Sequence, residues 1–159
     1  MRTYIGIDPG CNGGIAVITT PSNEGQAVMV ETYNMPETEK DIADLFLKLS
    51  HGVWIFALIE KVGSMPGNAA RAMFTFGRGY GALRMAMICR EISFDEVPPQ
   101  TWQKAIGVPP RKKTETKTQH KNKLKAKAQQ LYPNVRVTLA NADAILIADY
   151  LRRISLSPH

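Results

Sequence analysis

The first third of the chain alternates between short apolar runs and turn-forming residues. β-branched and aromatic residues favour a strand that starts near residue 4 and ends at Asp8, and a second apolar run follows at 15–18 after closely spaced glycines. A third run occupies residues 26–33, beyond a turn-forming segment at 21–25. Because short turns join neighbouring antiparallel strands, this pattern predicts three consecutive antiparallel strands.

The period of the apolar positions then changes. Spacings of i, i+3, i+4 and i+7 predict a helix at 38–49, and seven apolar residues without alternation at 53–59 are typical of a central strand covered on both faces. A strand, a helix and a buried strand in succession require a right-handed crossover, which places the fourth strand parallel to an earlier one. The remaining elements are predicted, in chain order, as a helix at 68–90, a strand at 92–97, a short helix at 100–107 and helices at 117–132 and 141–151. The pattern therefore predicts one α/β domain over residues 1–159, with a mixed five-stranded sheet and helices on both faces.

The predicted helix at 68–90 has an apolar stripe along one side and three glycines. Core packing is the simpler explanation of the stripe, and a dimer surface is the alternative. The stripe consists of Met73, Phe76, Tyr80, Leu83 and Met87. Gly77, Gly79 and Gly81 each weaken a helix by about 1 kcal/mol, so we expect a bend or the close approach of another backbone near residues 76–81.

Three acidic residues stand where predicted elements begin or end. Asp8 closes the first strand in an Asp-Pro-Gly turn, and Glu60 ends the buried strand. Asp143 occupies the first turn of the last helix, for which Asn141 is the expected N-cap. Each acid alone has an ordinary explanation, because turns favour Asp and helix N-termini favour negative charge. If the fourth strand lies beside the first, however, Asp8 and Glu60 emerge side by side.

Carboxylates gathered at one sheet edge repel one another unless a cation neutralises them. Hard oxygen ligands select Mg²⁺ or Mn²⁺. A pair of such ions about 4 Å apart would activate a water and stabilise the leaving oxygen in phosphodiester cleavage. The acids therefore point to metal-dependent chemistry on a phosphodiester.

Basic residues concentrate in one short segment of a chain with a net charge of +6. Eight of the 20 Lys and Arg lie between positions 111 and 127, with Glu115 as the only acid among them. They are Arg111, Lys112, Lys113, Lys117, Lys121, Lys123, Lys125 and Lys127. A local excess of this kind is typical of a surface that binds a phosphate backbone, although a solvated basic helix face is the alternative.

Length and composition limit the class of protein. A chain of 159 residues with 44% apolar residues can bury a core, which argues against disorder. There is no apolar run near 20 residues and no leader-like start, so we expect a cytoplasmic protein that does not enter a membrane. Cys11 and Cys89 lack metal-ligand spacing, and we expect reduced thiols, Cys11 in a loop and Cys89 packed on a helix.

Four short motifs lie in order along the chain. They are Ile5-Gly6-Ile7-Asp8-Pro9-Gly10, Leu58-Ile59-Glu60-Lys61-Val62, His120-Lys121 in the basic helix, and Ala142-Asp143-Ala144-Ile145-Leu146-Ile147-Ala148. In order and approximate spacing they resemble the motifs of the RuvC-type Holliday junction resolvases, or crossover junction endodeoxyribonucleases. Two further stretches, Met65-Pro66-Gly67 and Phe76-Gly77-Arg78-Gly79-Tyr80-Gly81, are similar to the phage and prophage branch. The resemblance covers nearly the whole chain.

The resemblance implies an RNase H-like fold and a homodimer that makes paired nicks across a four-way DNA junction in a bacterial or phage-infected cell. It further implies two Mg²⁺ ions per active site, which Mn²⁺ can replace. Asp8 would bridge both ions, Glu60 and Asp143 would supply the other acidic ligands, and Lys121 would lie near the scissile phosphate. The expected DNA-binding residues are Lys61, Met65, Arg71, Arg78, Arg111, Lys112, Lys113, Lys117, His120, Lys121 and Lys125.

Two departures from the family pattern qualify these expectations. Family members insert an aromatic or apolar wedge from the loop after the second acid, and here that loop offers Val62 and Met65 but no aromatic residue. The family also places an acid or a histidine three or four residues before the last Asp, where this chain has Leu139 and Ala140. We therefore expect one metal position to be held by only two protein ligands plus water, with weak Mg²⁺ affinity and slow or Mn²⁺-dependent cleavage.

Three alternatives stay open from the sequence. An actin-like or sugar-kinase ATPase also opens on an Asp-x-Gly hairpin, but it needs a second lobe. A monomeric RNase H would share the acids and cut RNA in a hybrid, without a use for the long helix at 68–90. A junction-binding protein with weakened catalysis would fit the absent fourth ligand.

Overall fold

The centre of the protein is a mixed five-stranded sheet. The computed structural model describes residues 1–21, 27–52, 54–63 and 69–156. The strands are β1 (Arg2–Asp8), β2 (Gly14–Thr20), β3 (Met29–Asn34), β4 (Ile55–Glu60) and β5 (Ser93–Val97), in the spatial order β3-β2-β1-β4-β5. β1 to β3 pair antiparallel, and β4 pairs parallel with both β1 and β5. The predicted mixed sheet is confirmed.

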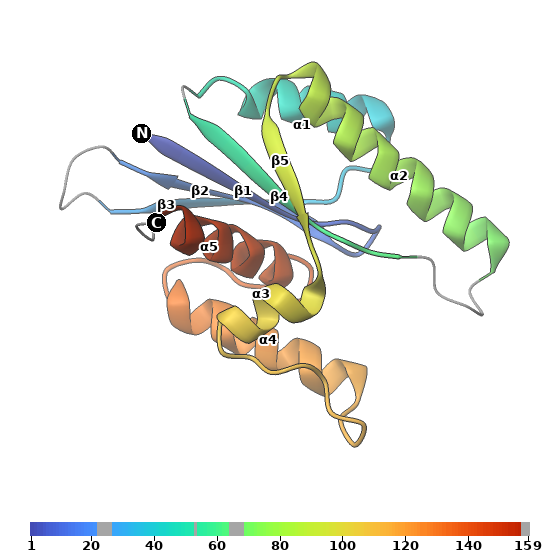
Figure 1. Cartoon of the computed structure of the whole chain (residues 1–159), viewed down its shortest axis with the longest axis vertical. Coiled ribbons are helices and arrows are strands. Elements are labelled where there is room, and N and C mark those ends of the chain that lie inside the picture. Colours follow the sequence, from blue (N-terminus) through green and yellow to red (C-terminus); the bar gives the residue numbers. More distant parts are fainter. Residues whose placement is uncertain (22–26, 53, 64–68, 157–159) are drawn as a thin grey trace.

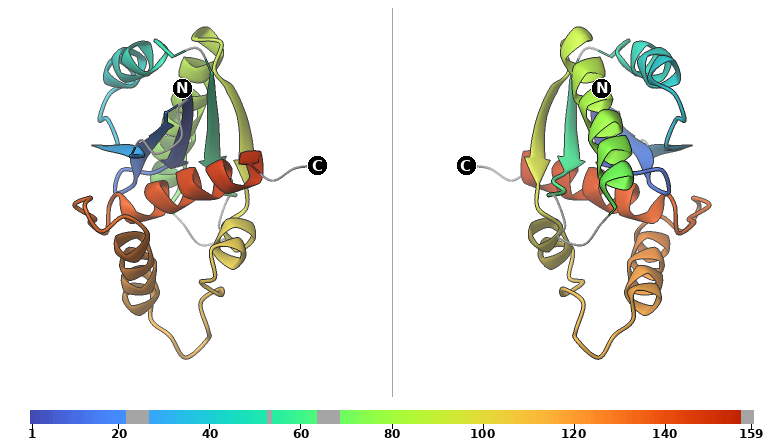
Figure 2. Two further views of the ribbon diagram at one scale, coloured as in Figure 1. Left: turned by 90° about the vertical axis from the view of Figure 1, so that its left-hand side faces the viewer. Right: turned by 90° about the vertical axis from the view of Figure 1, so that its right-hand side faces the viewer.

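Helices cover both faces of this sheet. α1 (Glu39–Leu49) and α2 (Ala70–Cys89) lie on one face, and α5 (Ala142–Leu156) lies on the other (Figure 1). α3 (Pro99–Ala105) and α4 (Lys117–Leu131) lie beyond α5, and α4 with the loop before it extends away from the sheet (Figure 2). Within the ranges that the structure describes, no helix is long and apolar enough to cross a membrane.

A glycine in β1 sets the contact between the sheet and α5. Tyr4 is buried on the α5 side of β1, and Ile5 and Ile7 are buried on the α1 and α2 side. A Cβ atom on Gly6 would lie 2.2 Å from the carbonyl oxygen of Ala144 in α5, far closer than atoms can approach. Only glycine at this position lets the helix backbone touch the strand. The contact holds the N-terminal turn of α5 close to the end of β1.

The parallel pairing of β1 and β4 determines where two of the acids lie. Ile7 is paired with Ile59, so Asp8 and Glu60 follow at the same edge of neighbouring strands. This confirms the crossover predicted from the sequence. On the other side of β4, Glu60 is paired with Val97, the last residue of β5.

Several local expectations differ from the structure. β4 begins at Ile55, and Trp54 lies outside the strand with 41% of its surface exposed. β3 begins at Met29, while the predicted start at Gln26 lies outside the described residues. The expected packing of Cys89 is wrong, because this thiol is exposed at the end of α2. The length and residue types of the apolar runs predict that these strands exist. Where each strand begins and ends depends on where its backbone pairing with the neighbouring strand stops.

The three glycines of α2 face open space in the described part of the chain. A Cβ atom on Gly77, Gly79 or Gly81 would meet no other atom within 4 Å, so the expected close approach of another backbone is wrong within the described chain. Of the predicted apolar stripe, Leu83 and Met87 are buried in the core. Other apolar residues of α2, Phe74, Met85 and Ile88, are exposed.

Candidate active site

The structure brings the four predicted catalytic residues to one edge of the sheet. Asp8 ends β1, Glu60 ends β4, and Asp143 lies in the first turn of α5. Asp143 is buried, with 9% of its surface exposed, and Lys121 of α4 places its Nζ 3.7 Å from Asp143 Oδ2. Asp8 interacts electrostatically with all three of the others. Four elements that are distant in sequence therefore converge on one site.

The carboxylates of this site are short of positive charge. Burial is the largest cause of the rise in the pKa of Asp8 to about 7. The negative charges of Asp143 and Glu60 also raise it, and the positive charge of Lys121 opposes the rise. Burial also raises the pKa of Glu60 to about 7, opposed by a hydrogen bond from Trp102. The pKa of Asp143 is raised by burial, and Lys121 works against that rise. One lysine does not compensate three carboxylates, of which Asp143 is buried and Asp8 and Glu60 are half-buried.

The donor set of the site fits a hard divalent cation. Among the described residues, no three His, Cys, Asp or Glu side chains form a group that could hold a metal ion as they stand. The raised pKa values of Asp8 and Glu60 nevertheless show that burial and repulsion oppose the charged state. A divalent cation relieves both effects, and oxygen-only donors favour Mg²⁺ or Mn²⁺ over softer metals. A bound ion would have to draw these neighbouring side chains together.

The indole of Trp102 contacts the site directly, which sequence reasoning missed. Trp102 lies in α3 with none of its surface exposed, and its Nε1–H donates a hydrogen bond of 2.8 Å to Glu60 Oε2. A buried indole N–H needs an acceptor. The sequence could therefore have indicated that a buried Trp102 needs a hydrogen-bond acceptor. Which residue accepts depends on how α3 packs beside the end of β4.

A groove of about 850 Å³ opens beside Asp8 and is lined by Arg71, Arg78 and Lys121. Phe76 and Tyr80 also line it, with ring centroids 5.9 Å apart and planes inclined by 29°. Both rings belong to the stripe for which core packing was the simpler expectation. They give the groove an aromatic wall that the loop after Glu60 lacks.

The predicted DNA-binding residues differ in exposure. Those with exposed side chains are Lys61, Arg71, Arg78, Arg111, Lys112, Lys113, Lys117 and Lys121, and Lys125 is half-buried. Arg78 pairs with Glu39 at 2.8 Å across the groove. Met65 lies outside the described residues. His120 differs from the others because it is buried.

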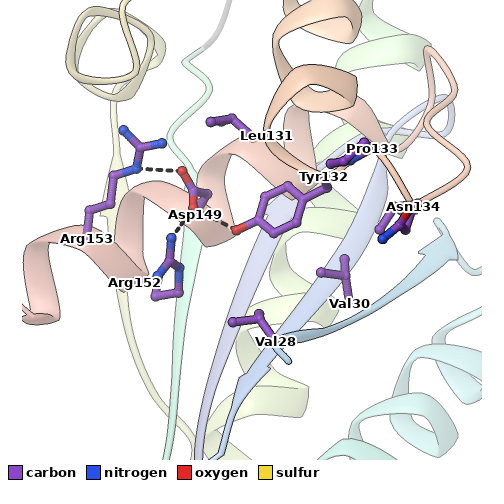
Figure 3. A pocket seen from close by; sticks show the side chains of 10 residues that line it. Val28, Val30, Leu131, Tyr132, Pro133, Asn134, Asp149, Arg152 and Arg153 are labelled. Carbon is purple, nitrogen blue, oxygen red and sulfur yellow. Dashed lines mark hydrogen bonds and ion pairs between the residues drawn. The ribbon is translucent and has the colours of Figure 1, made fainter. Parts of the chain in front are cut away.

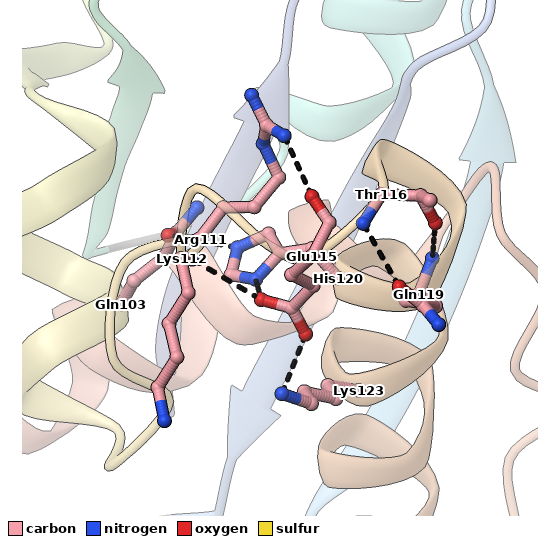
Figure 4. Close-up of polar contacts among 8 residues, drawn as sticks. All are labelled: Gln103, Arg111, Lys112, Glu115, Thr116, Gln119, His120 and Lys123. Carbon is pink, nitrogen blue, oxygen red and sulfur yellow. Dashed lines mark hydrogen bonds and ion pairs between the residues drawn. The ribbon is translucent and has the colours of Figure 1, made fainter.

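Glu115 holds the basic loop against α4 (Figure 4). Its carboxylate lies 2.5 Å from Lys123 Nζ and 3.6 Å from His120 Nδ1, and its backbone carbonyl accepts a hydrogen bond of 2.7 Å from Arg111. The hydrogen bond from Lys123 is the main reason that the pKa of Glu115 is lowered. His120 Nε2 lies 3.2 Å from Gln103 Oε1 of α3. The only acid of the basic segment thus joins loop and helix.

The position of the absent fourth ligand stays without a donor side chain. Leu139 is exposed, and Ala140 lies beside Gly14, which is paired with Asp8. Asn141 occupies the predicted N-cap position of α5, and its backbone carbonyl accepts a hydrogen bond of 3.0 Å from the N–H of Ile145. Its side-chain Oδ1 accepts a hydrogen bond of 2.7 Å from the backbone N–H of Thr138. The side-chain oxygen of Asn141 is therefore committed to the loop before the helix.

Asp149 lies in a separate pocket of about 360 Å³, as its position six residues after Asp143 predicts (Figure 3). Tyr132 donates a hydrogen bond of 2.7 Å to Asp149 Oδ1. Arg152 and Arg153 approach the same carboxylate at 2.9 and 2.6 Å. This acid is paired with its own cations and takes no part in the Asp8 site.

The sheet order, the crossover and the position of α5 are those of an RNase H-like fold. Among solved structures, the chain is similar to Thermus thermophilus RuvC, with 16% identity, 97% of each chain covered and a TM-score of 0.62. It is equally similar to T. thermophilus RuvC in complex with a Holliday junction substrate, at 16% identity, 97% and 96% coverage and a TM-score of 0.61. Protein-family models and curated proteins give no match. At this identity the likeness concerns the fold, and it confirms the predicted fold class.

Proposed function

We propose that this chain is a structure-specific endonuclease that resolves four-way DNA junctions by metal-dependent phosphodiester hydrolysis. One observation carries the proposal: Asp8, Glu60 and Asp143 form an under-compensated acidic site at the rim of a groove whose lining includes Arg71 and Lys121. Glu37 and Glu39 also line the groove, and Glu39 pairs with Arg78. The chain shares its fold with RuvC, which has been solved with a Holliday junction. Acids alone would fit many sites, but acids that lie beside Lys121 and the basic segment at 111–127 fit a phosphodiester substrate.

The residues of the site have separate roles in this proposal. Asp8, Glu60 and Asp143 would hold two Mg²⁺ ions per site, which Mn²⁺ could replace. Such ions would supply an activated water and stabilisation of the leaving oxygen. Lys121 lies between Asp143 and the groove, where its ammonium group can contact the scissile phosphate.

The DNA-binding surface continues from the groove to α4. Lys117, Lys121 and Lys125 follow one another at four-residue intervals along α4, and the loop before it presents Arg111 and its neighbours. Glu115 and His120 hold that loop in place, which gives the buried His120 a structural part in DNA binding. Meanwhile the exposed lysines supply the charge.

Replacing Lys117, Lys121 and Lys125 together by alanine tests this surface. We expect weaker junction binding and a salt dependence of log K that is shallower by about 0.9 per lost phosphate contact. Lys48→Ala, at the end of α1, is the matched control and should leave the slope unchanged. An unchanged slope in the triple variant would mean that this helix face is only solvated.

A homodimer is part of the proposal, because symmetric nicks in two strands require two sites related by a two-fold axis. The exposed apolar residues Phe74, Met85 and Ile88 of α2 provide the surface. Gly77 and Gly81 leave open space on the helix that a second α2 could fill. Sedimentation of the wild-type chain should show twice 17.6 kDa, and Met85→Glu should shift it toward the monomer. A wild-type monomer with and without junction DNA would contradict this part.

One nuclease assay separates the proposal from its alternatives. The purified chain is incubated in Mg²⁺ with a four-way junction, a linear duplex of the same sequence and an RNA–DNA hybrid. Paired nicks in the junction alone support the proposed function. Tight junction binding without cleavage would identify a junction-binding protein with weakened catalysis, and cleavage of only the hybrid would identify an RNase H.

A further inference from the structure

We propose that Trp102 is a positioning residue for Glu60. Its indole N–H holds one carboxylate oxygen, Oε2, at 2.8 Å and thereby presents the other oxygen to the cation. The inference rests on the proposed function, since it assigns a role toward the same metal site. Trp102 itself contacts neither DNA nor metal in this account.

The path of the chain explains why the indole reaches Glu60. β5 runs beside β4 so that Val97 is opposite Glu60, and the N–H of Lys61 donates to the Val97 carbonyl oxygen at 2.8 Å. Pro98 and Pro99 then end the strand and start α3 at once. Trp102 comes within the first turn of this helix. β5, the strand beside Glu60, therefore leads directly into the helix that carries the Trp102 N–H donor.

The surroundings of Trp102 fix the direction of its N–H. The ring is fully buried in the cluster that contains Ile106, Val108, Leu124 and Ile145. Ring atoms enclosed on all sides by packed side chains have no room for another rotamer. Its N–H has no contact with solvent, and Glu60 is its acceptor. The packing of α3 against the core therefore fixes the position of the Glu60 carboxylate through this hydrogen bond.

The chemistry of indole suits positioning better than filling space alone. Phenylalanine or leucine would also fill an apolar core, but neither brings a hydrogen-bond donor. Indole N–H donates and cannot accept, so it stabilises a carboxylate in one orientation without competing as a ligand. Among the three acids in the described structure, Glu60 is the one that receives a hydrogen bond from a buried neutral donor. Partners of this kind that orient a ligand are typically worth 10 to 100-fold in metal affinity.

The chain contains two tryptophans, so a Trp54→Phe background isolates Trp102. In this background, tryptophan is replaced throughout by β-(3-benzothienyl)alanine, which keeps the shape of the ring and lacks the N–H. Binding of Mn²⁺ is measured from the free-ion signal in electron paramagnetic resonance. We expect an affinity lower by about 10 to 100-fold, with junction cleavage recovering as Mn²⁺ is increased. An unchanged Mn²⁺ affinity would overturn the inference.

A second measurement needs no change at Trp102. The Trp54→Phe protein has a single indole N–H resonance, which should shift when Mg²⁺ is added and should not shift in Asp8→Asn. The inference would also be overturned if the indole N–H chemical shift stays unchanged while Mg²⁺ binds to a site that requires Asp8. If the Trp54→Phe protein binds no divalent cation and cuts no junction, while wild type does both, the background is at fault and the wild-type spectrum is used. If wild type does neither, the proposed function itself fails.

Discussion

Two buried acids on the same helix differ in how their charge is compensated. Asp143 and Asp149 both belong to α5, with 9% and 1% of their surfaces exposed. Asp149 has Tyr132, Arg152 and Arg153 around its carboxylate (Figure 3). Asp143 lies instead near two other carboxylates, Asp8 and Glu60, and its negative charge raises the pKa of each. It has one lysine, Lys121, within 4 Å.

The difference separates structural acids from functional ones. A buried charge is tolerated when the chain itself provides a partner. Where the chain gathers like charges instead, folding leaves a site that an external cation can complete. Burial alone therefore does not distinguish the two acids, whereas the sign of the neighbouring charges does.

The largest expected effect is on catalysis. Asp8→Asn keeps the size of the side chain and removes a ligand charge, so we expect junction cleavage to fall by more than about 100-fold while junction binding is nearly unchanged. Single-turnover cleavage and binding titrations measure the two effects separately. Cleavage at the wild-type rate in Mg²⁺ would contradict the assignment of the site.

The next effect concerns stability in the absence of metal. The pKa of Asp8 rises from 3.8 to about 7 on folding, so the folded state retains a proton that the unfolded state releases between these values. This contribution is present at low pH and is lost as pH rises through about 7, by up to about 4 kcal/mol. Denaturation without metal should show a steeper loss of stability from pH 4 to 7 in wild type than in Asp8→Asn. Mg²⁺ should restore stability at pH 8 in wild type only.

A smaller effect is expected at the compensated acid. Asp149→Asn leaves Arg152 and Arg153 without their carboxylate, and because both arginines are partly exposed we expect a loss of about 2 kcal/mol of unfolding free energy. Below the unfolding temperature the variant should still cut junctions with wild-type Mg²⁺ dependence. A changed Mg²⁺ requirement would mean that the two acids are not separate.

The smallest effect is expected from completing the acidic site. Residue 140 lies beside Gly14, opposite Asp8, so Ala140→Asp should lower the Mg²⁺ concentration required for cleavage by roughly tenfold. Leu139→His should act in the same direction, and Ala140→Asn is the neutral control of equal size. If Ala140→Asp and Leu139→His leave the Mg²⁺ dependence unchanged, the site is complete without a fourth ligand.

The sequence by itself determined the order of the elements and the location of the three acids. Strand and helix periods are local properties, and a right-handed crossover between parallel strands leaves few ways to arrange them. That rule places Glu60 at the same edge of the sheet as Asp8 only if the fourth strand lies beside the first, and the structure supplies that pairing. Asp143 needed the resemblance to resolvases, because an acid at a helix N-terminus is common without any function.

Only the tertiary structure decided which side chains support these acids. The contact between Trp102 and Glu60 joins residues 42 positions apart, and the Glu115 network depends on where a loop without periodicity settles against α4. Phe76 lines a groove and Met87 is buried in the core, although both lie on one predicted stripe. The apolar pattern predicts that a side chain is buried. Whether it meets the core, a partner or a substrate depends on which distant segment packs beside it.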